Sequence, residues 1–337
     1  MLDYSRGVKQ SADHVADLER AGLDIVWVAE AYGLDGPSQM GYIAARTERI
    51  EIGSGILPIY SRTPVLLAQT AAGIDALSEG RFILGLGASG PQVIEGWHGV
   101  PYTEPLERTR EIIGICRKVW RREVVTNDGL YPIPLPPGSG TGLGKPLKLI
   151  THPVRPDIPI WLASMGPKNV EMTAELAQGW FPFHFIPERA KDVWGESLAA
   201  GAARRSPELG PLEIAAGGLA AIGEGLEHLR DLARPLLALY IGGMGARGRN
   251  FYNALACRYG YEAEARTIQD LYLDGHKDEA AAAVPRELLE LTSLVGPAGY
   301  VHERLAAYRE AGVTVLNITA VGPDPLGTIE RLKQWCS

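Results

Sequence analysis

IEIGSGILPIYSRTPVLLAQTAAGIDALSEGRFILGLGASG, residues 50–90, contains a complete strand, helix and strand. Two apolar runs, at residues 50–56 and 81–88, carry few charged side chains on either face, as expected of parallel strands that helices cover. Residues 64–77 between them have the amphipathic spacing of a helix. This order predicts two parallel neighbours in one sheet, joined by a helix.

The same alternation continues along most of the chain. Further strand-like runs lie at residues 23–29, 158–164, 179–185, 212–220 and 313–319, and helix-period segments at 11–21, 106–120, 168–177 and 302–311. With a short run at residues 1–4 as the first strand, the pattern predicts an α/β fold, an eight-stranded (β/α)8 barrel of the TIM type. We expect a single barrel domain over residues 1–337, with insertions near 126–157 and 235–285 that shape a binding site.

Composition limits the function classes. The chain has 337 residues, 46% of them hydrophobic and 22% charged, which is typical of a soluble globular protein. The apolar runs are too short to cross a bilayer and the start lacks a targeting pattern, so we expect a cytoplasmic protein that binds no membrane. A net charge of -7 without a basic cluster argues against nucleic acid as a partner. Three scattered cysteines predict neither a disulfide framework nor a metal site.

The segment GLGASG, residues 85–90, matches the dinucleotide pattern G-x-G-x-x-G. The residues that should open a long helix after it are interrupted by Gly96, Gly99 and Pro101, so the pattern argues against nicotinamide bound in that manner. Its glycines would still let the backbone approach a flat ligand closely. A tight turn with small residues for packing is an equally good interpretation.

Two further segments have the character of a binding site. Ser164, Met165 and Gly166 lie between a strand and a helix that opens at Pro167, where free N–H groups attract phosphate; an unliganded turn is the alternative. The loop 240–253 combines glycines with two arginines and either folds over an anionic ligand or is simply solvated.

Two residues are candidates for acid–base chemistry. Glu30 ends the strand LDIVWVAE, and the carboxyl ends of barrel strands form the usual active-site face; Glu30 either carries a proton or caps the next turn. His184 lies between two phenylalanines and is either an acid or base or a packed wall residue. No Ser-His-Asp elbow, P-loop or H-E-x-x-H motif is present, which argues against the common hydrolases, NTPases and zinc proteases.

Taken together, several segments resemble the luciferase-like family of flavin and deazaflavin oxidoreductases, and more closely its branch that depends on coenzyme F420. The segments are VWVAEAYG (26–33), ERIEIGSGILPIYSRTP (48–64), ALSEGRFILGLGASGPQVIEGWHGVPY (76–102), GTGLGKPLK (140–148), IPIWLASMGPKNVEMTAELAQGW (158–180) and LALYIGGMGARGRNFYN (237–253). The resemblance implies an eight-stranded barrel, assembled as a homodimer, that transfers a hydride between coenzyme F420 and a small-molecule substrate.

The resemblance also implies a cofactor site. In the family, the third strand commonly ends in a non-proline cis peptide whose side chain backs the central ring of the deazaflavin, and the matching bond is Gly55–Ile56. Glu30 falls where relatives place an acidic residue near the ring. The other matching positions are Gly87, Ala88 and Ser89, which should lie along the cofactor, and Ser164, Met165 and Gly166, which should hold its phosphate.

Departures from the family pattern bear on the substrate. The sugar-phosphate dehydrogenases of the family carry a histidine where this chain has Ala31, an acid where it has Gly90, and a phosphate-binding lysine where it has the apolar run FHFI. A non-phosphorylated organic substrate is therefore expected. Two alternatives stay open: an FMN-dependent monooxygenase of the same fold, and a non-catalytic protein that binds the deazaflavin.

Overall fold

The structure is a computed structural model and describes residues 7–336. It divides into two compact units, which are described separately. The first comprises Met1–Ala163, Leu176–Gly179 and Ser206–Gly210, and the second comprises Ser164–Glu175, Trp180–Arg205 and Pro211–Ser337.

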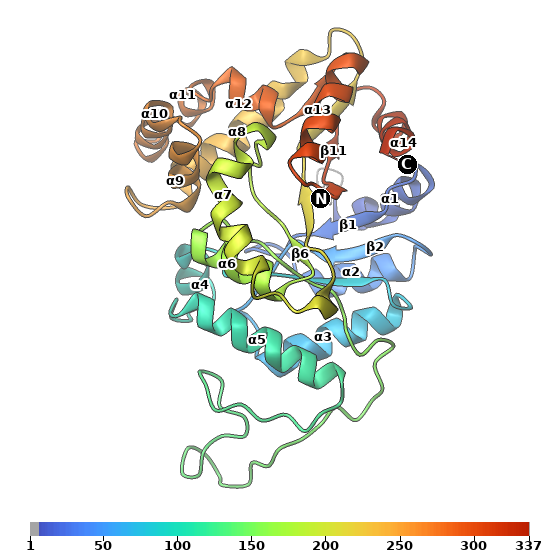
Figure 1. Cartoon of the computed structure of the whole chain (residues 1–337), viewed down its shortest axis with the longest axis vertical. Helices are drawn as coiled ribbons and strands as arrows, with labels where there is room; N and C mark the ends of the chain where they lie inside the picture. The colour runs from blue at the N-terminus through green and yellow to red at the C-terminus, as the bar shows by residue number, and fades with distance from the viewer. Residues whose placement is uncertain (1–6, 337) are drawn as a thin grey trace. The chain divides into compact units, whose positions relative to one another are not determined.

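The first unit contains a parallel sheet. Strands β1 (Ile25–Val28), β2 (Glu51–Ser54), β4 (Phe82–Gly87) and β5 (Ile160–Leu162) follow one another in space, and β3 (Leu57–Pro58) pairs with the end of β4. The helices are α1 (Val8–Arg20), α2 (Gly36–Ala44), α3 (Pro64–Leu77), α4 (Pro91–Gly96) and α5 (Pro105–Trp120). Helices α3 and α5 pack along each other (Figure 1). The parallel strands predicted at residues 50–56 and 81–88 are confirmed.

Two tryptophans fill the interior of the first unit, and glycines face them. Trp27 on β1 stands opposite Gly53 on β2, and an added Cβ at Gly53 would lie 2.3 Å from the indole ring. Gly179 has the same relation to Trp161 on β5, at 2.0 Å. The two indole rings are 5.3 Å apart and both are buried. The core therefore accommodates Trp27 and Trp161 because a glycine faces each indole ring.

A long segment, residues 121–159, connects α5 to β5 in the first unit without regular helix or strand, apart from an isolated bridge between Asn127 and Ile133. The carboxylate of Glu111 on α5 anchors its first part by accepting the N–H groups of Leu130 and Tyr131, at 2.8 and 3.1 Å. The green trace of Figure 1 shows this segment extending beyond α3 and α5.

The second unit contains two sets of parallel pairs. Strand β7 (Glu213–Ala216) pairs with β10 (Val315–Leu316), while β8 (Leu219–Ile222) pairs with both β9 (Leu294–Gly296) and β11 (Thr319–Ala320). The longer helices are α6 (Pro167–Leu176), α7 (Pro187–Ala202), α9 (Phe251–Arg258), α10 (Glu262–Leu273), α13 (Ala298–Glu310) and α14 (Pro325–Cys336). Shorter helices are α8 (Arg234–Ala238), α11 (Lys277–Ala282) and α12 (Arg286–Leu291), and the π-helix η3 (Leu239–Gly243) follows α8.

Several predicted strands differ from those of the structure. The run at 179–185 forms only β6 (Gly179–Trp180), and His184 within it has a left-handed backbone, with φ of 48°. The run at 212–220 is divided into β7 and β8 at Gly218, where an added Cβ would lie 2.0 Å from the carbonyl oxygen of Thr292. Strand β9 was not predicted, because three residues give too short an apolar signal. The run at residues 1–4 lies outside the described residues.

Candidate active site

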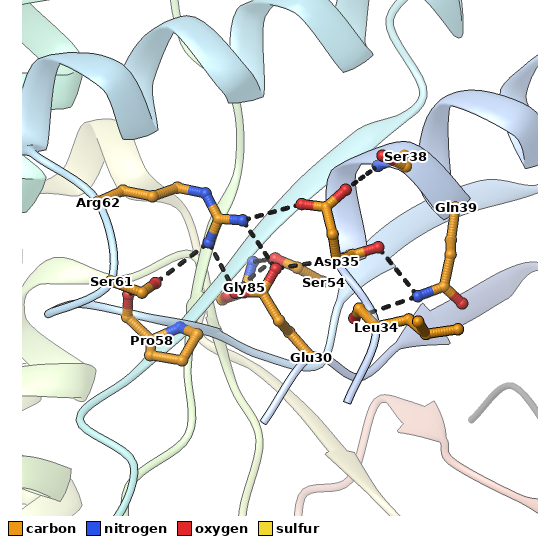
Figure 2. Close-up of polar contacts among 11 residues, drawn as sticks. Glu30, Leu34, Asp35, Ser38, Gln39, Ser54, Pro58, Ser61, Arg62 and Gly85 are labelled. Carbon is orange, nitrogen blue, oxygen red and sulfur yellow. Dashed lines mark hydrogen bonds and ion pairs between the residues drawn. The ribbon is translucent and has the colours of Figure 1, made fainter. Parts of the chain in front are cut away.

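Glu30 lies just beyond β1 and forms an ion pair with Arg62, which lies just before α3 (Figure 2). Oε1 and Oε2 of Glu30 each accept a hydrogen bond of 2.7 Å, from Nη1 and Nη2 of Arg62 respectively. Oε2 also accepts the backbone N–H of Gly36 at 2.9 Å. Both carboxylate oxygens are therefore occupied, in the two-pronged geometry that holds an arginine firmly.

Arg62 has further partners on both sides of this pair. Nη2 lies 3.3 Å from Oδ1 of Asp35, and Nη1 donates to Oγ of Ser61 at 3.2 Å (Figure 2). Asp35 also caps α2, since its Oδ2 accepts the N–H of Ser38 at 2.8 Å. The neighbouring carboxylates, Glu30 first, raise the pKa of Arg62 above its ordinary value. The side chains of Glu30 and Arg62 are 9% and 14% exposed, so the pair is shielded from most of the solvent.

The Gly55–Ile56 peptide bond is cis, as the family resemblance implied. Ile56 follows β2 and its side chain is half-buried, while its neighbours Ser54 and Leu57 are fully buried. Its side-chain carbons Cγ1 and Cδ1 lie 3.2 Å from the position that a Cβ on Gly87 would occupy. Ile56 thus packs directly over the backbone of Gly87 and retains an exposed part.

The glycines of GLGASG have packing roles. A Cβ on Gly85 would lie 1.8 Å from the carbonyl oxygen of Ser54, and Oγ of Ser54 accepts the Gly85 N–H and donates to the Gly85 carbonyl, both at 2.8 Å. Gly90 precedes α4, which has only six residues. These contacts agree with the interpretation of GLGASG as a tight turn. The short helix α4 is not the long helix that a dinucleotide site requires. Ala88 and Ser89 between them are half-buried, and Ser89 has a left-handed backbone with φ of 58°.

Ser164, Met165 and Gly166 lie in the second unit, at the start of α6. The hydroxyl of Ser164 is buried and hydrogen-bonds the hydroxyl of Thr173 at 2.8 Å, and its carbonyl accepts Nε1–H of Trp180. The side chain of Ser164 therefore fixes the turn. The backbone N–H groups of Met165, Gly166 and Lys168 have no hydrogen-bond partner in the described chain, as an anion site at a helix start requires.

Two cationic side chains, Arg258 and Lys168, lie at this turn. Nη1 of Arg258, on α9, donates to the carbonyl of Met165 at 3.4 Å, and its Nη2 donates to the carbonyl of Val193. The side chain of Lys168 is 78% exposed, and its Nζ lies 3.0 Å from Oε2 of Glu171. Arg258 follows Met165 by 93 positions, so only the folded chain shows that the two meet.

In the loop 240–253, Arg247 is not free to bind an anion. Nε of Arg247 donates to Asp270 at 2.8 Å, and the guanidinium also lies 3.7 Å from Asp274. Both acids lie at the end of α10. The charge of Arg247 is therefore already balanced by carboxylates of its own unit.

His184 lies in the second unit and is enclosed by aromatic rings. Its ring centroid is 3.7 Å from that of Phe183 and 6.1 Å from that of Tyr240. Its Nε2 is buried and has no hydrogen-bond partner among the described residues. Burial lowers the pKa of His184 from 6.5 to about 3, because the imidazolium form would lose its hydration. The imidazole is therefore neutral at physiological pH.

The predicted site residues thus fall into two sets. Glu30, Gly55, Ile56, Gly87, Ala88 and Ser89 belong to the first unit, and Ser164, Met165, Gly166 and His184 belong to the second. In residues 7–336, no group of three or more His, Cys, Asp and Glu side chains is arranged to hold a metal ion. Over the same range, no helix combines the length and apolar character needed to span a bilayer.

The sequence model of the luciferase-like monooxygenase family matches residues 1–315. The chain belongs to this family. Its fold class is accordingly the luciferase-like TIM-type barrel, and the predicted fold class is confirmed.

Relatives within the family extend over nearly the whole chain. A Mycobacterium tuberculosis protein named "Putative coenzyme F420-dependent oxidoreductase Rv3520c" is 43% identical over 326 residues, which are 95% of this chain and 93% of that protein. The 5,10-methylenetetrahydromethanopterin reductase of Archaeoglobus fulgidus is 26% identical over 323 residues, 93% of this chain and 90% of the relative. The structure of the coenzyme F420-dependent tetrahydromethanopterin reductase of Methanopyrus kandleri superposes with a TM-score of 0.76 at 21% identity, over 97% of this chain and 94% of the other.

Proposed function

We propose that this protein is a coenzyme F420-dependent oxidoreductase that transfers a hydride between the deazaflavin and a small, non-phosphorylated organic substrate. The observation that carries the proposal is the 43% identity, over 95% of the chain, with a relative whose name specifies coenzyme F420. The half-buried Ile56 side chain over Gly87 supports it, because this pair offers an apolar surface to a flat ring.

The residues of this chain fit the coenzyme. Ile56 would support one face of the ring system, with the backbone of Gly87, Ala88 and Ser89 along its edge. The unpaired N–H groups at the start of α6 would bind the phosphate, with Arg258 nearby on the same unit. The bound coenzyme supplies the carbon that accepts or donates the hydride, and the protein orients the substrate against it.

The two acid–base candidates have different properties in the structure. Both oxygens of Glu30 are engaged by Arg62, so we propose that Glu30 fixes Arg62 in place near the ring. Burial lowers the pKa of His184 to about 3. We therefore propose that its imidazole is neutral and hydrogen-bonds the substrate, and that it does not carry a full proton.

Departures from the sugar-phosphate dehydrogenase pattern support a non-phosphorylated substrate. Ala31 is exposed and offers no proton carrier, and the run 183–186 contributes aromatic and aliphatic side chains where those enzymes use a lysine. A phosphate would meet no cation from this run.

We further propose a single barrel domain over residues 1–337 that assembles as a homodimer. The family model matches residues 1–315 as one stretch, which supports the single domain. For the dimer we point to residues 129–156, where Leu135, Leu143, Leu147 and Ile150 are 58 to 90% exposed. This segment contains lysines and an arginine but no acidic residue, whereas the chain as a whole carries a net charge of -7. A second copy of the chain is thus an electrostatically matched partner.

Titrating the apo-protein with coenzyme F420 and FMN side by side tests the cofactor. We expect saturable binding of F420 at micromolar concentrations, and FMN binding at least tenfold weaker. Tighter binding of FMN, with oxygen consumption by the reduced complex, would instead identify the FMN-dependent monooxygenase. Reduced F420 that binds but reacts with no member of a panel of enones, imines and nitro compounds would identify the non-catalytic alternative.

A further inference from the structure

Four aromatic side chains of the second unit form one cluster: Phe183, His184, Tyr240 and Tyr252. The ring centroid of Phe183 lies 4.2 Å from that of Tyr240 and 4.9 Å from that of Tyr252. The ring centroids of the two tyrosines are 4.6 Å apart. All four residues are half-buried. The cluster therefore retains exposed aromatic surface and contains no charged group at neutral pH, since its histidine is neutral.

Local structure holds these side chains in place. The side chain of Asn250, which is 4% exposed, donates to the carbonyls of Tyr240 and Ile241 at 2.9 and 3.0 Å. Its Oδ1 accepts the N–H groups of Tyr252 and Asn253 at 2.9 and 3.1 Å, which caps α9. One asparagine thus joins η3, which carries Tyr240, to the helix start that carries Tyr252.

Tyr240 and His184 both have an unusual backbone conformation. Tyr240 lies in a π-helix, a conformation that is rare and frequent at functional sites. Gly242 in the same turn packs against Tyr272, where an added Cβ would lie 2.5 Å from the tyrosine Cβ. His184 has φ of 48°, a left-handed conformation that few non-glycine residues adopt. The fold therefore specifies the position of each ring.

The imidazole of His184 is the one polar group of the cluster with an enclosed, unsatisfied atom. Nε2 is buried without a partner in the described chain, and such an atom is costly unless something completes its hydrogen bond. An apolar residue of similar shape would avoid this cost. A ligand oxygen or N–H group that reaches the ring would satisfy it.

We propose that this aromatic cluster binds the substrate, and that the substrate is a planar, uncharged compound with a carbonyl group that hydrogen-bonds the imidazole of His184. The identification of the ligand as the hydride-transfer substrate depends on the proposed function. Planarity follows from the exposed ring surfaces, on which a flat molecule stacks favourably. Absence of charge follows because no side chain of the cluster could balance one.

Two small probes test this on the apo-protein: 1-indanone, a flat bicyclic ketone, and indane, which has the same skeleton without the carbonyl. Calorimetric titration should show that wild-type protein binds both, 1-indanone more tightly. His184→Phe keeps an aromatic ring and removes the nitrogens, so it should weaken 1-indanone binding about five- to tenfold and change indane binding less than twofold. Tyr252→Ala should weaken binding of both probes at least threefold.

Phe251→Ala is the matched control, because Phe251 is the neighbour of Tyr252 on α9 but is 59% exposed and outside the cluster. It should leave both dissociation constants unchanged. The proposal is overturned if wild-type protein binds neither probe, if His184→Phe affects both probes equally or neither, or if Phe251→Ala acts like Tyr252→Ala. Circular dichroism and the melting temperature establish that each variant is folded.

The same protein preparation is titrated with coenzyme F420. Binding of the probes in the expected pattern without binding of F420 would overturn the proposed function and leave the aromatic cluster as a ligand site. Binding of F420 without the expected pattern would overturn the aromatic site alone.

Discussion

Most contacts of the candidate site are made by individual side chains, and several of these residues could not be identified from the sequence. Glu30 was singled out because it ends an apolar strand, but its partner Arg62 lies 32 positions away in a segment with no comparable signal. Arg258 and Asn250 were missed for the same reason, since each acts through carbonyl groups that only the folded chain brings near. Glu30 itself could be found, because the apolar strand that precedes it is a local signal.

The ion pair of Glu30 and Arg62 provides a test at this scale. Glu30→Gln keeps the shape of the side chain but leaves the largely buried Arg62 with less compensation for its charge. We expect the free energy of unfolding to fall by about 2 to 4 kcal/mol, measured by urea denaturation. Lys9→Met, which removes the exposed pair with Asp13, should reduce the free energy of unfolding much less. Equal costs in the two variants would contradict a structural role for Glu30.

His184 makes stability depend on pH. In the unfolded chain its pKa is near 6.5, and burial lowers it to about 3 in the folded protein, so between these values only the unfolded chain binds the proton. The titration of His184 therefore lowers the free energy of unfolding as the pH falls from about 6.5 towards 3. The loss is at most about 1.4 kcal/mol per pH unit.

Urea denaturation of wild-type protein and His184→Phe at pH 7, 6 and 5 measures this contribution. We expect the variant to gain stability relative to wild type as the pH falls, because a phenylalanine side chain takes up no proton in either state. Parallel pH profiles for the two proteins would show that His184 titrates normally in the folded chain.

At the scale of elements, the sequence predicts the strand and helix units of the first unit well and the second unit less well. The runs at 50–56, 64–77 and 81–88 became β2, α3 and β4, because most of their apolar side chains are buried in the structure. Strand β9 and the split between β7 and β8 depend on close backbone approaches, such as that of Gly218 to Thr292. The insertion predicted near 235–285 is largely helical, from α8 to α11, and no helix was predicted there.

Glycines opposite tryptophans give a prediction about the sheet. Gly53→Ala places a Cβ 2.3 Å from the ring of Trp27, so we expect it to destabilise the protein by about 3 kcal/mol. Gly73→Ala is the control, since Gly73 lies exposed within α3 with no atom near its added Cβ. That variant should stabilise the protein by about 0.5 to 1 kcal/mol. Gly53→Ala as stable as wild type would mean that β1 and β2 are not paired in this register.

For the whole molecule, the exposed segment 129–156 predicts self-association. Leu143 and Ile150 are 83% and 90% exposed, and burying two such side chains contributes about 3 kcal/mol or more to association. Light scattering after size exclusion should give the mass of two 36.4 kDa chains for wild type. Leu143→Lys with Ile150→Lys should give the mass of one, whereas Leu232→Lys, at another exposed position, should not. A monomeric wild type, or a dimeric double variant, would contradict this role.

The central claim is that the surface of Ile56 over Gly87 receives the ring of coenzyme F420. Gly87→Ala would place a Cβ 3.2 Å from the Ile56 side chain, and Gly96→Ala meets no atom within 4 Å. The dissociation constant of F420 for these variants is the most direct measurement. We predict that Gly87→Ala binds F420 about tenfold more weakly with little change in melting temperature, while Gly96→Ala binds it like wild type. An unchanged dissociation constant in Gly87→Ala would contradict the claim.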